Sequence, residues 1–439
     1  MRPPDEVRQT KQTMIKNITE NMRWYDWLQF EAMAIMSAAV PVSMNLGLWA
    51  AMLLLGASLT KAVAMRKVGN RTLSRPVKAA LCGPMVYWLC LLVGALVGGG
   101  METGLHVVRL KATMLIFPVA VMVADTSSIK GVHLRLMFYA LWAACMGVFL
   151  YFSGVAVGKM LSGSELASVV NNTFDPRHHA YTAMYAAAAL AFVYVELRNH
   201  SGSLRPWLRW LLIVSVPLLV LYIVIVNSRA GIIILWAMLV LAAVDGVRRN
   251  WWKTLIVMAL IAGWIVLCGA MLPGYKDRVT STISAVSEAA ADTTESADGD
   301  VRITILKSAL EQVQESPVVG HGTGNYREEL VRQYEADAFE HGVDAEYNAH
   351  NQYVESLLAT GVFGLIALLY FLFAPLVVAL TRARGAVLPL LFATGIVAGN
   401  LLVESMLERQ MGLLFIGWFM TLMVLVVSSE ENKFCEKEK

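Results

Sequence analysis

Residues 217–236 read PLLVLYIVIVNSRAGIIILW, two apolar runs separated by Asn227, Ser228 and Arg229. The runs extend outward over 208–226 and 230–246, and each is close to the length that crosses a bilayer as a helix. A single buried span would place the charge of Arg229 in hydrocarbon, which is costly. The pattern therefore predicts two membrane-spanning helices joined by a tight turn, and it leaves open what a cation does there.

The composition of the whole chain agrees with this interpretation. Of its 439 residues, 57% are hydrophobic and 16% are charged, whereas soluble domains are roughly half apolar and about a quarter charged. Because a membrane-spanning segment must satisfy its own backbone hydrogen bonds, repeated long apolar stretches predict an all-α, polytopic integral membrane protein. Hydropathy predicts about twelve spans: 28–44, 46–64, 78–97, 105–124, 133–157, 179–196, 208–226, 230–246, 253–272, 352–380, 386–404 and 411–428.

The distribution of basic residues sets the orientation. With the N-terminus inside, the inner tails and connections hold 23 of the 36 Lys and Arg residues, and the outer connections hold only 10, mostly in one long loop. Short basic loops face the cytoplasm. The predicted organisation is a cytoplasmic tail (1–27), nine spans (28–272), a large outer loop with amphipathic helices (273–351), three spans (352–428) and a second cytoplasmic tail (429–439). The first 27 residues lack the pattern of a cleaved signal peptide.

Four arginines lie at the outer face in this topology: Arg109, Arg177, Arg229 and Arg302. Each alone could be a snorkelling residue with its charge in the interface. Together they favour a bound anionic ligand, since the guanidinium group suits phosphate.

The outer loop contains one predicted surface helix. Within RITILKSALEQVQES (302–316), Ile303, Leu306, Leu310 and Val313 share one face at helical spacing. Asp300 is the expected N-cap, and Pro317 follows the helix end. The helix either lies along the membrane surface or packs on the bundle, and both can hold.

Two further loop patterns resemble ligand motifs but favour structural roles. PVVGHGTGNYREEL (317–330) is rich in glycine yet lacks the phosphate-loop spacing. It predicts a turn that starts a helix at Asn325, with His321 as a structural residue. Asp298-Gly299-Asp300 matches the D-x-D pattern of metal-binding sites, but in so acidic a stretch chance is the better explanation. The five cysteines have neither disulfide nor zinc spacing.

Polar residues recur where the chain re-enters the membrane. His350 and Asn351 begin the segment HNQYVES, and a histidine at a membrane mouth is either an interfacial residue or a general base. The last outer turn, VESMLERQMG, adds Glu404, Glu408 and Arg409, which could pair with the arginines or orient them.

These motifs together resemble the bacterial O-antigen ligase family. The resemblance rests on SRAG (228–231), DVR (300–302), the 317–326 pattern P-x-x-G-x-G-x-x-N-Y, HNQY (350–353) and the closing ESMLERQ (404–410), and it spans most of 105–428. O-antigen polymerases and related oligosaccharyltransferases share the pattern.

The resemblance implies a GT-C-like glycosyltransferase of the bacterial inner membrane that works at the periplasmic face without a metal or cofactor. The donor would be a glycan on undecaprenyl diphosphate, and the acceptor a sugar hydroxyl of lipid A-core, among membrane lipids and with no nucleic acid. Arg229, Arg302 and His350 match the family's functional residues. We further expect substrate contacts from Arg109, Arg177, His178, Asn351, Tyr353 and Glu404.

Several alternatives remain at this level. A polymerase would use the same donor with another lipid-linked repeat as acceptor, and a protein-glycosylating enzyme would use a Ser or Thr hydroxyl. His350 could contact phosphate instead of acting as the base. A polysaccharide or lipid transporter also has about twelve spans, but such transporters usually consist of two similar halves, and no half-repeat is evident here.

Overall fold

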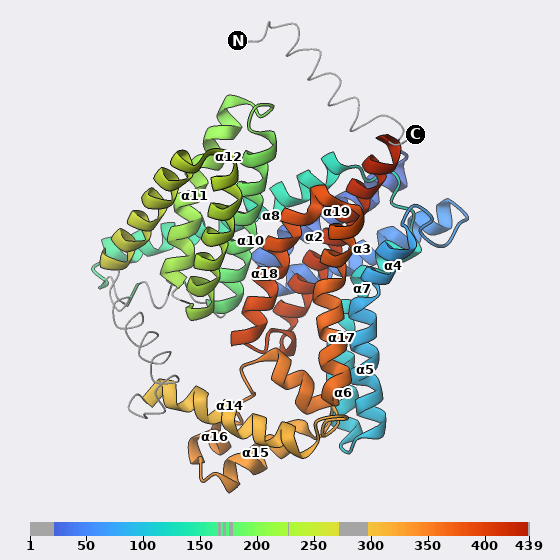
Figure 1. Cartoon of the computed structure of the whole chain (residues 1–439), viewed down its shortest axis with the longest axis vertical. Coiled ribbons are helices and arrows are strands. Elements are labelled where there is room, and N and C mark those ends of the chain that lie inside the picture. The colour runs from blue at the N-terminus through green and yellow to red at the C-terminus, as the bar shows by residue number, and fades with distance from the viewer. Residues whose placement is uncertain are drawn as a thin grey trace, which may run out of the picture.

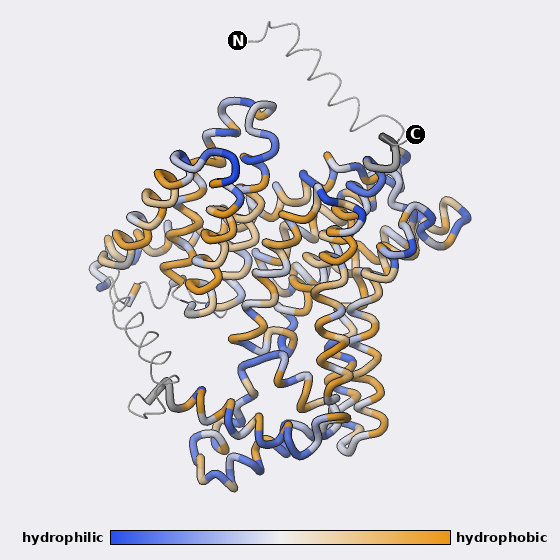
Figure 2. Tube along the Cα trace, viewed as in Figure 1, coloured by the Kyte–Doolittle hydropathy of each residue, from blue (hydrophilic) through white to orange (hydrophobic). Residues whose placement is uncertain are grey.

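The chain forms a bundle of long helices with a smaller helical unit at one end. The computed structural model describes residues 22–165, 168–169, 173–174, 179–226, 228–271 and 297–437, and within these residues every regular element is helical. Figure 1 shows α14, α15 and α16 at one end of the bundle and the C-terminal end of α19 at the other. Apolar residues dominate the bundle, and polar residues dominate the smaller unit (Figure 2).

The bundle and the smaller unit are made of the following elements. In chain order they are α2 (Trp24–Val42), α3 (Met44–Ala64), α4 (Arg75–Leu81), α5 (Gly83–Val97), α6 (Met101–Lys111), η1 (Ala112–Leu115), α7 (Ile116–Val123), α8 (Gly131–Leu161), α10 (His179–His200), α11 (Pro206–Val226), α12 (Arg229–Met271), α14 (Ala297–Glu315), α15 (Tyr326–Ala336), α16 (Glu340–Ala345), α17 (Gln352–Arg382), η2 (Arg384–Ala386), α18 (Val387–Val403), η3 (Met406–Glu408) and α19 (Gln410–Lys437).

The helices make this a multi-pass membrane protein, although the predicted count of twelve spans is not confirmed. Within the described residues nine helices are long and apolar enough to cross a membrane, or ten if the bent pair α4–α5 is one span. The predicted first span differs because α2 carries Asp26, Gln29 and Glu31 and does not qualify. The predicted spans 230–246 and 253–272 both lie in the 43-residue run α12, in which the non-helical residue Asn250 separates them.

Helix α12 contains a sharp break at Asn250. The backbone there is extended (φ −159°, ψ 90°), and a methyl group added to Gly246 would lie 2.7 Å from Thr254 Oγ1. Residues eight apart in a straight helix are separated by about 12 Å. The two parts of α12 therefore fold toward each other at the point where the sequence predicted a connection.

The helix α14 corrects two expectations. It begins at Ala297, so Asp300 lies inside the helix instead of capping it, while Pro317 follows its end at Glu315 as predicted. Its buried positions are Ile305, Ser308, Ala309 and Gln312, whereas Leu306 and Leu310 are about two-fifths exposed (37% and 42%). Small side chains allow α14 to approach α15 and α17 closely, so the apolar face read from periodicity is not the one that packs inward.

The glycine-rich segment after α14 fits into a break in α17. The break lies at Thr360 and Gly361, where His321 N–H donates to Leu358 O (2.7 Å) and Val362 N–H donates to Pro317 O (3.0 Å). Thr323 Oγ1 donates to Leu91 O of α5 (2.7 Å), and His321 Nε2 lies 2.8 Å from Gln312 O. The segment thus joins α14, α5 and α17, and α15 begins directly after Asn325, as predicted.

We expect Gly361→Ala to destabilise the protein by at least about 1–3 kcal/mol, the cost of placing a side chain in a backbone region reserved for glycine. Gly361 has φ +63°, and its added methyl would lie 2.2 Å from Val318 O. Gly395→Ala in α18 is the control, because nothing lies within 4 Å of its added methyl. A thermal midpoint of Gly361→Ala equal to that of Gly395→Ala would contradict this account.

Candidate active site

Five consecutive residues between α18 and α19 organise a polar site next to the small helical unit of α14, α15 and α16. We call Glu404, Ser405, Met406, Leu407 and Glu408 the 404–408 turn. Helix α18 ends with Glu404 as its C-cap, and the short η3 helix follows. Each polar group of this turn meets a different part of the chain.

Glu404 connects two of the predicted catalytic residues. Its Oε1 lies 3.2 Å from His350 Nδ1, and its Oε2 lies 3.8 Å from Arg302 Nη2 of α14. The three side chains are partly open, with exposed fractions of 13% for Glu404, 27% for His350 and 42% for Arg302. A carboxylate on Nδ1 leaves the opposite ring nitrogen, Nε2, as the position that can accept a proton.

The backbone at His350 has an uncommon conformation. Its φ is +45°, in the left-handed region that non-glycine residues seldom adopt. Asn348 Oδ1 accepts the His350 N–H (3.0 Å), and Glu355 Oε1 accepts the N–H of the preceding Ala349 (2.9 Å). Such strain persists where surrounding contacts enforce it, and these two bonds fix the chain that presents the imidazole.

Glu355 also holds the 404–408 turn. Its Oε1 accepts a hydrogen bond from Ser405 Oγ (3.4 Å), and its side chain is buried in the first turn of α17. The same oxygen therefore ties the segment before His350 to the residue after Glu404. Glu355 therefore helps to position both His350 and Glu404.

Asn351 and Tyr353 have structural contacts in this site. Asn351 Oδ1 caps α17 by accepting from the N–H groups of Tyr353 (3.0 Å) and Val354 (3.2 Å). Tyr353 Oη donates to Ala398 O of α18 (3.0 Å). These bonds set the start of α17 against α18, where His350 meets Glu404.

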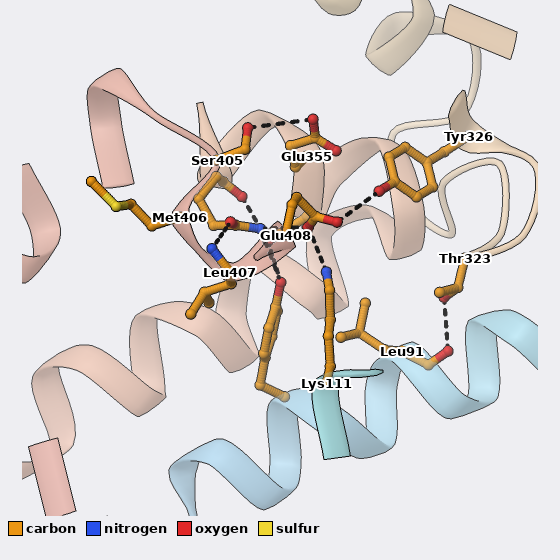
Figure 3. Close-up of polar contacts among 12 residues, drawn as sticks. Leu91, Lys111, Thr323, Tyr326, Glu355, Ser405, Met406, Leu407 and Glu408 are labelled. Carbon is orange, nitrogen blue, oxygen red and sulfur yellow. Dashed lines mark hydrogen bonds and ion pairs between the residues drawn. The ribbon is translucent and has the colours of Figure 1, made fainter. Parts of the chain in front are cut away.

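Glu408 forms the second half of the site, a buried network beside the first. Its carboxylate meets Lys111 Nζ of α6 (2.5 Å), Arg327 Nη2 (3.1 Å), Tyr326 Oη (3.3 Å) and Gln352 Nε2 (3.2 Å). Figure 3 shows Lys111 and Tyr326 converging on Glu408, with Ser405 reaching Glu355 nearby. The network clamps α15 onto α6, α17 and the 404–408 turn.

The charges around Glu408 change its pKa and predict an acid-dependent stability. Burial by itself raises the pKa of Glu408, but Lys111 and Arg327 outweigh it and lower the pKa to about 2 from 4.5. A depressed pKa contributes stability above the unfolded value, and this contribution is lost as the pH falls. We expect the thermal midpoint of the wild type to fall from pH 4.5 toward pH 2, and this part of the decline to be absent in Glu408→Gln. Parallel profiles for the two proteins would contradict the assignment.

The other predicted substrate residues, and the predicted catalytic residue Arg229, are not joined to this site by described contacts. Arg109 is exposed on α6, and its guanidinium lies 3.2 Å from His106 Nδ1. Arg177 and His178 lie outside the described residues, as does the side chain of Arg229. Their substrate contacts therefore stay predictions.

The backbone of SRAG has a clear structural role. Ser228 Oγ accepts the Gly231 N–H (3.2 Å) at the start of α12. A methyl group on Gly231 would lie 2.5 Å from Ala183 Cβ of α10, so glycine permits the close approach of the two helices. This contact fixes the first turn of α12, where Arg229 stands.

Lys111 and Gln352 are site residues that the sequence did not single out. Lys111 lies in an apolar stretch two residues after Arg109, and a charged residue in such a stretch was the signal that the sequence offered. Gln352 Oε1 accepts the Leu407 N–H (2.7 Å) inside the 404–408 turn. Among the residues that the structure describes, no three His, Cys, Asp or Glu side chains gather as metal ligands would.

Comparison with known proteins adds an independent finding. Residues 214–369 match the family model described as O-antigen ligase. No curated protein matches the chain. The matched region runs from α11 into α17 and includes SRAG, DVR, the glycine-rich segment and HNQY, whereas Lys111 and the 404–408 turn lie outside it. This region of the chain, residues 214–369, is therefore similar to the O-antigen ligase family.

Proposed function

We propose that the protein is an O-antigen ligase that moves a glycan from undecaprenyl diphosphate to a sugar hydroxyl of lipid A-core at the periplasmic face of the inner membrane. The observation that carries this proposal is the contact of Glu404 with both His350 and Arg302. Through Glu404, the imidazole of His350 lies near the guanidinium of Arg302, which supports a base and a cation acting together. The family match favours ligase- or polymerase-type transfer.

His350 would act as the general base. Glu404 holds the Nδ1 side of the ring, so Nε2 takes the proton of the acceptor hydroxyl as its oxygen attacks the anomeric carbon. The bond from that carbon to the diphosphate oxygen breaks, and its electron pair leaves with the diphosphate. Displacement in one step inverts the anomeric centre.

Arg302 and Arg229 would bind the diphosphate. Negative charge grows on the leaving oxygen in the transition state, and fixed cations in a poorly hydrated site stabilise it. Arg302 is held near Glu404 yet two-fifths exposed (42%), which suits a guanidinium that must reach a ligand. This role supplies a reason for the arginine in the short turn between α11 and α12.

The orientation follows from charge. The basic tails and short loops lie on the side assigned to the cytoplasm, and the 273–351 loop lies on the other side. Exposed Leu306, Leu310, Val318 and Val319 on the small helical unit suit a unit that rests on the membrane surface.

A lipopolysaccharide gel of a deletion strain tests the function. We expect bare core, accumulated lipid-linked glycan, and rescue by the wild-type gene. Core capped with a single repeat would instead identify a polymerase and overturn the acceptor assignment. An unchanged gel would place the protein in another pathway.

We expect Arg302→Ala to lower transfer about 10²–10³-fold, the effect of losing one group that stabilises transition-state charge. Arg332→Ala is the matched control, because Arg332 lies in the same unit, is 63% exposed and pairs only with Glu329 among described residues. Transfer from purified lipid-linked donor to lipid A-core measures both variants. Equal activity of Arg302→Ala and Arg332→Ala would remove Arg302 from the site.

A further inference from the structure

A second polar cavity lies far from the transfer site, at the other end of the bundle. It has a volume of about 560 Å³ and is formed by the start of α2, the end of α3, the connection 124–130 and the start of α8. Gly131, at the start of α8, lies beside Ser429 and Lys433 near the end of α19. Since α19 ends opposite the unit of α14–α16 (Figure 1), the cavity opens on the side that charge assigns to the cytoplasm.

The floor of the cavity is a fixed, buried ion pair. Lys61 is 1% exposed and its Nζ meets Asp26 Oδ1 (2.7 Å), Gln29 Oε1 (2.9 Å) and Ser128 Oγ (3.0 Å). These contacts tie α2 and α3 to the connection before α8. Lys61 therefore shapes the cavity, and its three contacts use the three donors of its ammonium group.

The wall carries more positive than negative charge. Asp125, the other acidic lining residue, already accepts from the N–H (3.0 Å) and hydroxyl (3.0 Å) of Ser127. Lys67 and Lys130 are exposed lining residues that form no ion pair with any described residue. Arg23 also lines the cavity, and among the described residues its Nη1 donates to the Tyr25 hydroxyl (2.9 Å). A concave site with excess cations favours an anion.

Apolar side chains stand next to these cations. Trp24, Val63 and Val68 are neighbours of the lining residues in sequence, with exposed fractions of 63%, 76% and 79%. Tryptophan favours the membrane interface, and basic pockets between helices on the cytoplasmic side bind anionic lipid headgroups. A phospholipid with its phosphate in the cavity would thus keep its acyl chains against the exposed apolar surface.

We propose that this cavity binds the phosphate headgroup of an anionic phospholipid from the inner leaflet. Lys67 and Lys130 contact the phosphate, Arg23 adds charge at the rim, and the Lys61–Asp26 pair holds the floor. None of these residues takes part in the proposed transfer, so the lipid site can be tested independently of that function.

Titration of the full chain in neutral detergent with short-chain phosphatidylglycerol tests the proposal. We expect saturable binding, and roughly 25-fold weaker binding in Lys67→Gln/Lys130→Gln, because each basic residue near an anionic lipid contributes about fivefold. The matched control is Arg71→Gln/Arg75→Gln, which removes one charge from the connection that holds Lys67 and one from the start of α4, both outside the lining. This control should bind as the wild type does. Thermal midpoints verify that both variants fold.

The other probes separate the sources of the anion. Short-chain phosphatidylcholine, which has no net charge, should bind far more weakly. Glycerol 3-phosphate binding as tightly as phosphatidylglycerol, with the same dependence on Lys67 and Lys130, would identify a soluble phosphate and overturn the lipid assignment. Phosphatidylglycerol binding that is absent, or equal in the lining variant and the control, would overturn the site itself.

Discussion

Replacing His350 by glutamine is expected to lower glycan transfer about 10²–10⁴-fold, the usual contribution of a general base. Glutamine can still donate a hydrogen bond to Glu404, but it cannot take a proton from the acceptor. The fold should persist, since His350 is partly exposed and its backbone N–H bond to Asn348 does not depend on the side chain. Transfer in vitro and the lipopolysaccharide gel both measure the loss.

The matched control for this variant is His341→Gln. His341 belongs to the same loop unit and is exposed, and its Nε2 lies 2.9 Å from the Tyr347 hydroxyl, away from Glu404. It should retain transfer. If His350→Gln kept full turnover, the base assignment would fail, and weaker donor binding with unchanged turnover would support the phosphate-contact role instead.

The sequence predicted the helical membrane class and the residues with local motifs. Arg302 and His350 stand in short recognisable patterns, and the structure brings both within reach of Glu404. No local pattern, however, pairs His350 with a residue 54 positions later, because that contact depends on how α17 packs against α18.

Two kinds of information were missing from the sequence. Periodicity identifies an apolar stripe, but in α14 packing favoured the small residues Ser308 and Ala309, and the stripe of Leu306 and Leu310 remained exposed. Lys111 and Glu408 are 297 positions apart, so their pairing follows only from the tertiary fold. The predicted number of spans is not confirmed, since α2 carries polar residues and the two spans predicted in α12 meet at a single non-helical residue.

The largest stability effect is expected for Lys111→Met, at about 3–5 kcal/mol, because removing one partner of a buried pair leaves the other charge without compensation. Glu408 is 5% exposed and, among the residues with described positions, would keep the half-exposed Arg327 as its one cationic partner. Methionine retains the length and apolar stem of lysine, so the loss of stability reports the removal of the positive charge. The thermal midpoint of the purified protein measures it.

Two further variants decide whether the charge pair is the cause. Arg109→Met, two residues away on the same helix, should change the midpoint little, because Arg109 is exposed and its described contact is with His106. Lys111→Met/Glu408→Leu removes both charges, and it should recover part of the lost stability, since apolar replacements of a buried pair are often tolerated. A double variant less stable than Lys111→Met would show that Glu408 stabilises the fold through Tyr326 and Gln352 without Lys111. Recovery of stability without recovery of transfer would show that the clamp also holds the 404–408 turn in the geometry that Glu404 needs to reach His350.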